Sequence, residues 1–252
     1  MTKGVIYVAT GPGYVDLALQ SARSLRASNP GLAVDLFTDD RGADGLEIFD
    51  QVHSVPVVHP RAKLECMALS RFQRTLFLDA DTLVVGDLGD LWGVLDRFDL
   101  ALAHDVRRAS KLIRAGLEVE TPYAFPQLNS GVVLYRQSAA MAGFLADWLQ
   151  RFRGAGVARD QIVLKDVLWS SDLRFYVLPP EFNLRRVTVL EAWEPLDAEV
   201  KIIHSHRLMD HLRVPGAARI SDLETLLRVE REALAQEWRA VGHPSRINWF
   251  TR

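Results

Sequence analysis

Cysteine is nearly absent from this chain of 252 residues, because Cys66 is the only one. A single thiol excludes a framework of disulfides within the chain and a zinc site built from cysteines. Disulfides persist in oxidising compartments, so a lone cysteine is compatible with a reducing one.

Long apolar runs are also lacking, and none approaches the roughly 18 apolar residues that cross a bilayer as a helix. The N-terminal "MTKGVIYVATGPG" holds only a short apolar run, typical of a first strand and not of a signal peptide. We therefore expect a cytoplasmic protein. The formal net charge is only -2, which gives no electrostatic case for a nucleic-acid partner.

Short apolar runs alternate with amphipathic segments along the chain. "GVIYVAT" (residues 4–10) is β-branched and uncharged, as in a strand buried on both faces, and one apolar helical face follows over residues 14–28. Further strands are expected at 33–40, 52–58, 75–81, 99–105, 129–136, 174–179, 187–190 and 200–206. Further helices are expected at 62–72, 139–152, 160–169 and 221–241.

This order predicts an α/β fold with a mostly parallel sheet and helices on both faces. The proline in 52–58 places that strand near an edge, and Ser221 with Glu224 forms a capping box that predicts where the last helix begins. No linker interrupts the sequence. We expect one domain over 1–252, with a nucleotide-binding half to about 105, a second half over about 106–206, and a C-terminal helix over about 220–241.

The stretch "TLFLDADTLV" carries two aspartates where a buried strand ends. Residues two apart on a strand point to the same side, roughly 6.6 Å apart, so Asp79 and Asp81 could share one cation while Ala80 turns away. Oxygen ligands suit Mn²⁺ or Mg²⁺, whose shells phosphate oxygens commonly complete. Asp39 ends another expected strand, and ligands of such sheets bind at these strand ends. The alternative is that the acids only solvate a strand end or cap a short helix near Asp87.

"LFLDADTLV" also matches the first motif of the aspartate-nucleophile phosphatases of the haloacid dehalogenase type, with Thr82 in place. That family delivers a second acidic pair after a later strand. Here the best such pair, Asp39-Asp40, lies upstream. A metal-dependent phosphohydrolase therefore stays an alternative.

Several pieces in the same order carry a stronger resemblance: "KLECMALSRFQRTLFLDADTLVVGDLGDLW", "AHD", "LNSGVVLYR", "DQIVL", "LPPEFN" and "KIIHSH". From residue 4 to about residue 206 the chain resembles the retaining GT-A glycosyltransferases of family eight, the glycogenin and galactosyltransferase group. The resemblance implies a GT-A fold, a UDP-sugar donor, Mn²⁺ and retained anomeric configuration.

The resemblance also implies roles for individual residues. Asp79, Asp81 and His204 match the metal ligands, and a neutral imidazole among oxygens suits a borderline ion. Lys63 matches a lysine beside the donor, where an ammonium would stabilise charge on the leaving group. Asp160 and Gln161 match the pair beside the reacting carbon, although Asp160 could also be the N-cap of its helix.

Other matched positions imply contacts with the rest of the donor. Asp105, Asn129 and Ser130 would hold sugar hydroxyls, and Tyr14 would stack on uracil. The remaining donor-side residues are Ala9, Thr10, Asp39, Asp79 and Ala80.

One departure concerns the residues after His204. The family has a glycine and then a lysine-proline-tryptophan run that grips the diphosphate, whereas this chain reads "HSHRLMDHLRVPG". Arg207 and His206 are the candidates for the positive group. A catalytically weak domain that binds sugar nucleotides is therefore a further alternative.

The acceptor is not identified by the sequence. Residues 106–126 are interpreted as an acceptor-side loop or ordinary surface. The tail 237–252 mixes arginine with tryptophan and phenylalanine, so it packs back on the domain or makes a weak contact with a membrane surface.

Overall fold

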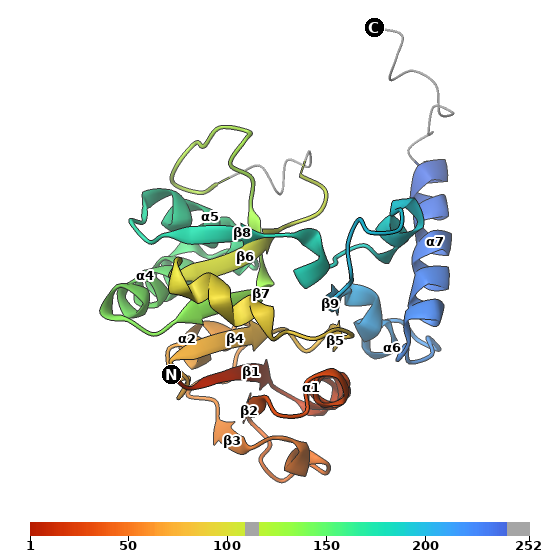
Figure 1. Cartoon of the computed structure of the whole chain (residues 1–252), viewed down its shortest axis with the longest axis horizontal. Helices are drawn as coiled ribbons and strands as arrows, with labels where there is room; N and C mark the ends of the chain where they lie inside the picture. Colours follow the sequence, from red (N-terminus) through yellow and green to blue (C-terminus); the bar gives the residue numbers. More distant parts are fainter. Residues whose placement is uncertain (109–115, 241–252) are drawn as a thin grey trace, which may run out of the picture.

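A seven-stranded sheet is the centre of the computed structural model, which describes residues 1–108 and 116–240. Its order is β3-β2-β1-β4-β7-β6-β8, and Figure 1 shows helices flanking it. The strands are β1 Lys3–Ala9, β2 Ala33–Thr38, β3 Gln51–Ser54, β4 Arg74–Leu78, β6 Leu100–His104, β7 Leu128–Arg136 and β8 Phe175–Leu178. A two-stranded sheet pairs β5 Thr82–Val84 with β9 Ile202–His204.

β7 alone runs against the other strands of the large sheet. Reversal of this strand puts its first residues at the edge where β1, β4 and β6 end. Polar residues at the start of β7 therefore meet those that follow β4 and β6. The predicted mostly parallel α/β sheet is confirmed.

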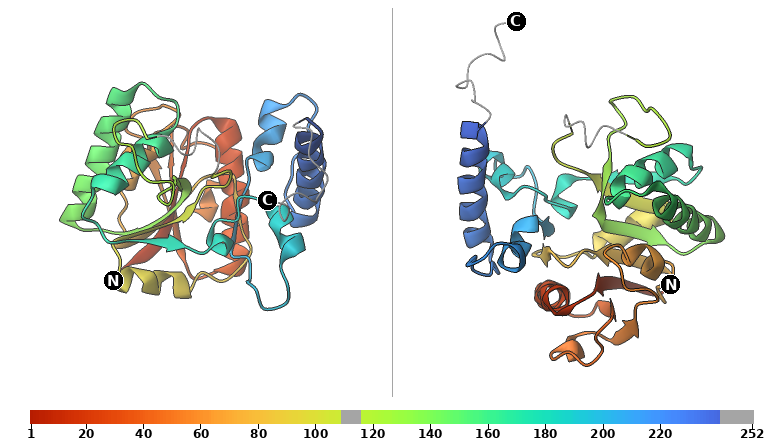
Figure 2. Two further views of the ribbon diagram at one scale, coloured as in Figure 1. Left: turned by 90° about the horizontal axis from the view of Figure 1, so that it is seen from above. Right: turned by 180° about the vertical axis from the view of Figure 1, so that it is seen from behind.

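Helices cover both faces of the sheet. They are α1 Pro12–Ser28, α2 Lys63–Met67, α4 Ala139–Ala155, α5 Asp160–Ser170, α6 Asp210–Arg213 and α7 Leu223–Ala240. Short 3₁₀ helices are η1 Leu46–Ile48, η2 Asp90–Asp96, η3 Pro180–Phe182, η4 Val187–Ala192 and η5 His206–Met209. Figure 2 shows α4 and α5 on one side of the sheet and α1 with α7 on the other.

Alternate residues of the same strands pack into two separate hydrophobic cores, one on each face of the sheet. On β4, Leu76 and Leu78 pack toward α1, whereas Phe77 packs toward α2, α4 and α5. This alternation follows from the two-residue period of a strand. Burial on both faces explains why strands such as β1 and β6 have nearly continuous apolar sequences.

The structure corrects several expected elements. Residues 187–190 form η4 and not a strand, because only Val187 is buried and the Thr188 amide donates to Glu230 Oε2 (3.3 Å), with no strand beside it. α7 begins at Leu223 with Asp222 as its cap, since Asp222 Oδ1 accepts from the Thr225 amide (2.8 Å), so the expected capping box is wrong.

Other boundaries differ by several residues. β3 ends before the proline of 52–58 and lies at an edge, as expected. α2 covers only the start of 62–72. Over the described ranges, no helix combines the length and apolar character needed to cross a membrane. The expected contact of the tail falls mostly outside them, and the division into halves stays a prediction.

Candidate metal and nucleotide-sugar site

Asp79 and Asp81 lie in the connection between β4 and β5, not on a strand. The expected geometry of two strand residues pointing to one side is therefore wrong. The connection is held from both ends: the Asp79 amide donates to Gly131 O (2.8 Å), and Thr82 Oγ1 donates to Asp79 O (2.8 Å). β5 then pairs with β9, which places Thr82 opposite His204.

This pairing brings two acids and an imidazole together. His204 Nε2 lies 3.4 Å from Asp81 Oδ1 and 3.8 Å from Asp79 Oδ2. One ligand atom from each residue lies within 4.8 Å of the others, and Asp81 and His204 are buried. Ligands of one Mg²⁺-sized ion are about 3 to 4.2 Å apart, since each bond is about 2.1 Å. The cluster therefore fits a divalent cation.

The charge of Asp81 is stabilised in place. Burial by itself would raise the pKa of this carboxyl, but the His204 imidazole and then the Arg185 guanidinium hold the pKa well below its usual range. The Asp81 carboxyl is therefore ionised at neutral pH.

Gly131, at the start of β7, leaves the space in which the cluster forms. A Cβ at this position would lie 2.0 Å from His204 Cε1 and 2.7 Å from Asp79 Oδ2. Real Cβ atoms do not approach so closely, so any other residue would push two of the three side chains away. Gly131 belongs to the quoted piece "LNSGVVLYR", but nothing in a single sequence distinguishes it from an ordinary glycine in a strand.

A chain of amide hydrogen bonds orients His204. Asn183 Nδ2 donates to Asn129 Oδ1 (3.0 Å), which also accepts from the Gly131 amide, so Asn183 Oδ1 faces His204 Nδ1 (2.9 Å). Asn183 therefore accepts the proton of Nδ1, which leaves Nε2 as the ring atom available to a cation between the acids. Asn183 closes the quoted piece "LPPEFN", yet the sequence did not single it out.

The same chain continues toward Asp105. Asn129 Nδ2 lies 3.2 Å from Gln161 Oε1, and Gln161 Nε2 donates to Asp105 Oδ2 (2.6 Å). Residues from β7, α5 and the end of β6 thus form one connected network beside the cluster. Such networks hold polar groups in fixed positions.

Lys63 lies on the other side of Asp79 and is almost fully buried. Its Nζ donates to Ser130 O (2.9 Å) and Oγ (3.0 Å) and is 3.4 Å from both Asp79 and Asp160. Ser130 Oγ in turn donates to Asp160 Oδ2 (2.6 Å). A buried ammonium is tolerated here because two carboxylates and two oxygens surround it.

Asp160 is the first residue of α5 and not its N-cap, which is Arg159. Burial opposes ionisation of its carboxyl, but Lys63, Arg61 and the Ser130 hydroxyl lower the pKa. Its carboxylate therefore belongs to the polar network around Lys63.

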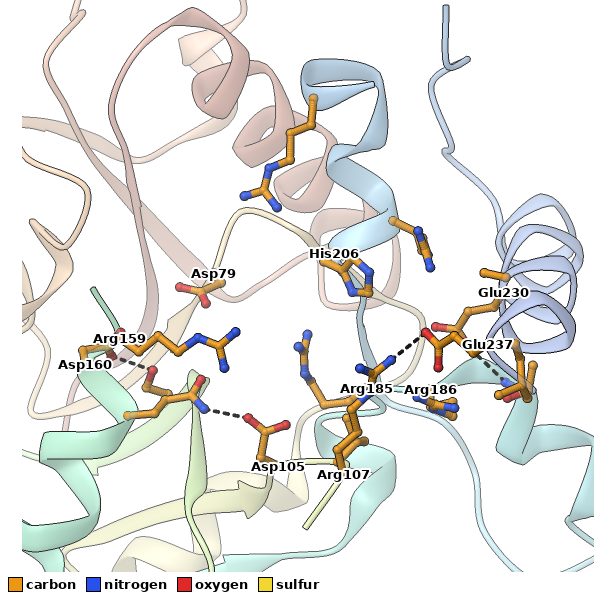
Figure 3. A pocket seen from close by; sticks show the side chains of 18 of the residues that line it. Asp79, Asp105, Arg107, Arg159, Asp160, Arg185, Arg186, His206, Glu230 and Glu237 are labelled. Atoms are coloured by element: carbon orange, nitrogen blue, oxygen red, sulfur yellow. Dashed lines mark hydrogen bonds and ion pairs between the residues drawn. The ribbon is translucent and has the colours of Figure 1, made fainter. Parts of the chain in front are cut away.

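Two adjoining cavities open onto this network. The first, of about 780 Å³, is lined by the cluster and by expected donor residues: Ala9, Thr10, Tyr14, Lys63, Asp79, Ala80, Asp81, Asn129, Gln161 and His204. The second, of about 620 Å³, is lined by Lys63, Asp79, Asp105, Ser130, Asp160, Gln161 and Arg207, and by α7. We call them the donor cavity and the distal cavity. In Figure 3, Asp79 and Asp160 lie on one side of the distal cavity, opposite Glu230 and Glu237 of α7.

Four expected donor residues do not line the donor cavity: Asp105, Ser130 and Arg207 line only the distal cavity, and Asp39 lines neither. The Oδ1 atom of Asp39 accepts from the Gly11 amide (2.8 Å) just before α1. His206, by contrast, lines both cavities.

Arginines that the sequence did not single out gather where the cavities meet. Arg61, Arg159, Arg185 and Arg213 line both of them. They come from four segments far apart in the chain, so no local motif marked them.

The comparisons with known proteins show relatives with a similar sequence or fold. Human glycogenin-1 is 28% identical over 172 residues, which is 64% of this chain and 43% of that protein. GlyE of Streptococcus pneumoniae TIGR4 superposes over 95% of this chain and 64% of its own, with a TM-score of 0.59 and 16% identity. LgtC superposes over 94% of this chain and 99% of its own, with a TM-score of 0.58 and 14% identity. The fold is the GT-A fold of glycosyltransferases.

The GT-A fold confirms the resemblance to the glycogenin type that the sequence indicated. The chain spans less than half the length of glycogenin-1 and about two thirds of GlyE. LgtC, a galactosyltransferase, has been solved with analogues of a donor and an acceptor sugar. A comparison with models of known protein families finds no match.

Proposed function

We propose that this chain is a metal-dependent glycosyltransferase that moves a hexose from a UDP-sugar to an acceptor hydroxyl with retention of configuration. The cluster of Asp79, Asp81 and His204 at the floor of a cleft in a GT-A fold carries the proposal. The matched family and the single imidazole among oxygens favour Mn²⁺, with Mg²⁺ as the alternative. When bound, the ion supplies positive charge that stabilises the departing diphosphate.

The donor cavity fits the parts of a UDP-sugar in order. Tyr14 at its outer end is partly exposed and offers a ring for stacking on uracil. Ala9 and Thr10 lie at the end of β1, on the same wall. Asn129 and Gln161 at the inner end, continued by Asp105 in the distal cavity, offer donors and acceptors to sugar hydroxyls, which rewards a correctly placed hydroxyl group.

Arginines take the place of the missing lysine-proline-tryptophan run in this proposal. The segment after His204 folds as η5 and α6 and packs on α1, with Leu212 against Gly13. Arg213 thereby reaches Tyr14 OH (3.4 Å) across the cavity. Arg159, Arg185 and Arg213 are the groups we assign to the diphosphate, because all three line both cavities and guanidinium binds phosphate well.

In the proposed reaction, the bond from the anomeric carbon to the diphosphate oxygen breaks, and a bond from that carbon to the acceptor oxygen forms. Lys63 stabilises negative charge on the leaving group. The carboxylate of Asp160 is engaged by Lys63, Arg61 and Ser130, so it is poorly placed to be a covalent nucleophile. Front-face attack fits better, with the acceptor proton passing to the departing phosphate oxygen.

The first experiment is a thermal unfolding series with UDP and Mn²⁺. Ligand that binds only the folded state should raise the melting temperature by mass action. Asp81→Asn should remove the part of this shift that depends on metal. The proposal fails if no nucleoside diphosphate shifts the wild type with metal present.

A panel of UDP-sugars then separates the alternatives. Slow Mn²⁺-dependent hydrolysis of one UDP-sugar, releasing UDP and the free sugar, supports a transferase. Release of phosphate from simple phosphate esters would instead indicate the phosphohydrolase. Binding of UDP without either reaction would indicate a catalytically weak domain.

A further inference from the structure

The distal cavity has a wall that the donor cavity lacks. Helix α7 contributes Glu230, Ala233, Leu234 and Glu237, and Figure 3 shows the two acids facing the cavity. Ala233 and Leu234 provide an apolar strip between them. A cavity of about 620 Å³ has room for a saccharide, whose C–H face suits such a strip.

The acids of this wall are already engaged within the protein. Glu230 accepts from the Thr188 amide (3.3 Å) and from Ser205 Oγ (3.4 Å). Glu237 pairs with Arg107, with Nη2 2.6 Å from Oε1. Asp160 is likewise paired with Lys63 and Arg61, whereas Glu230 and Asp105 accept hydrogen bonds only from neutral groups in the described ranges. The cavity is still positive as a whole, because seven arginines and Lys63 line it against five carboxylates.

Among the arginines that line the distal cavity but not the donor cavity, Arg186 and Arg207 lack a complete set of partners in the part of the chain that the structure describes. The Arg186 side chain makes no hydrogen bond or ion pair with any residue in the described ranges. Arg207 Nη1 lies 3.5 Å from Asp210, but its Nε is buried and has no hydrogen-bond partner among the described residues. Both line the distal cavity and not the donor cavity, so a bound diphosphate is not their natural partner.

A buried donor such as Arg207 Nε, which has no partner in the described part of the chain, costs free energy unless a ligand binds it, and the half-exposed Arg186 guanidinium is available beside it. Carboxylates and phosphates both match the geometry of guanidinium. We infer that the distal cavity takes an acceptor that carries an anionic group, a phosphate ester or a carboxylate, and that Arg186 and Arg207 bind this group. The inference rests on the proposed transfer reaction, in which the distal cavity is the acceptor side.

The test uses the whole chain saturated with UDP and Mn²⁺. Glucose, glucose 6-phosphate and glucuronate are added to it at equal ionic strength and equal free Mn²⁺, and the melting temperature is followed. The anionic sugars should raise it beyond the shift from UDP, and glucose should not. The two anionic arms show whether a phosphate or a carboxylate is preferred.

The double variant Arg186→Gln with Arg207→Gln should weaken binding of the anionic sugar by about tenfold or more. Arg228→Gln is the matched control, because Arg228 is an exposed arginine of α7 outside both cavities. An unchanged shift from UDP shows that each variant is folded.

Three results would overturn the inference: no shift from either anionic sugar, an equal shift from glucose, or an unchanged shift in the double variant. The inference would also fail if an anionic sugar raised the melting temperature without UDP but not with saturating UDP. The anion would then occupy the position of the diphosphate. Failure of the proposed function is distinct, because UDP with Mn²⁺ would then give no shift.

Discussion

The two sides of the cleft are built differently. On the side of the sheet, His204, Asn183, Asn129, Gln161 and Asp105 form one continuous set of hydrogen bonds. On the side of the short helices, arginines line the cavities, and several lack a partner among the described residues.

This difference separates a preorganised region from one that a ligand completes. The sheet side keeps its polar groups in position before anything binds, as transition-state stabilisation requires. On the arginine side, guanidinium groups remain available to bind the anionic groups of substrates. The following predictions test this contrast, from the largest expected effect to the smallest.

Gly131→Ala should have the largest effect. The new Cβ would overlap His204 Cε1. Loss of a residue that only orients a metal ligand lowers metal affinity by up to roughly 100-fold, and displacing the ligand itself should lower it by more. The measurement is the Mn²⁺ dependence of the melting temperature with UDP. Gly143→Ala is the control, because its Cβ on α4 would meet nothing within 4 Å. Retained metal dependence in Gly131→Ala would refute the cluster geometry.

Asn183→Ala should weaken Mn²⁺ by about 10- to 100-fold, because His204 loses the acceptor for its Nδ1 proton. Titration calorimetry of Mn²⁺ into the UDP complex measures this loss. If the affinity were unchanged, the hydrogen-bond chain would not orient the imidazole.

Arg159→Gln probes the opposite side. This exposed side chain has no hydrogen bond or ion pair in the described part of the chain, so its loss should not alter the fold. UDP should bind roughly tenfold more weakly, the equivalent of one charge-assisted hydrogen bond of about 1.5 kcal/mol. The effect should shrink at high salt, and Mn²⁺ dependence should remain. Equal UDP affinity in wild type and variant would remove Arg159 from the diphosphate site.

Asp160→Asn tests the charge balance of the sheet side through a change with pH, and that change is the smallest of the four expected signals. The folded-state pKa of Asp160 is lowered, so its stabilisation is present above the unfolded value of about 3.9 and is lost as pH falls below it. The gap in melting temperature between wild type and variant should therefore narrow between pH 5 and pH 3. One proton limits this slope to about 1.4 kcal/mol per pH unit. A constant gap would contradict the lowered pKa.

The sequence predicted the elements that form the large sheet because buried strands have a strong apolar signal. It was wrong at 187–190, where a short strand was expected but the Thr188 amide donates to Glu230 of α7. It was also wrong about the geometry of Asp79 and Asp81, which converge through a connection between two sheets. Neither outcome follows from local pattern, since both depend on residues more than 40 positions away.

The sequence by itself determined the mostly parallel α/β architecture, the resemblance to GT-A glycosyltransferases, and the acids and histidine that gather at the site. The tertiary structure alone decided that Gly131 leaves room for them, that Asn183 orients His204, and that arginines from four segments meet at the junction of two cavities. Apolar periodicity is written in neighbouring residues and can be read locally. Close approach and charge complementarity are properties of residue pairs that only the folded chain brings together.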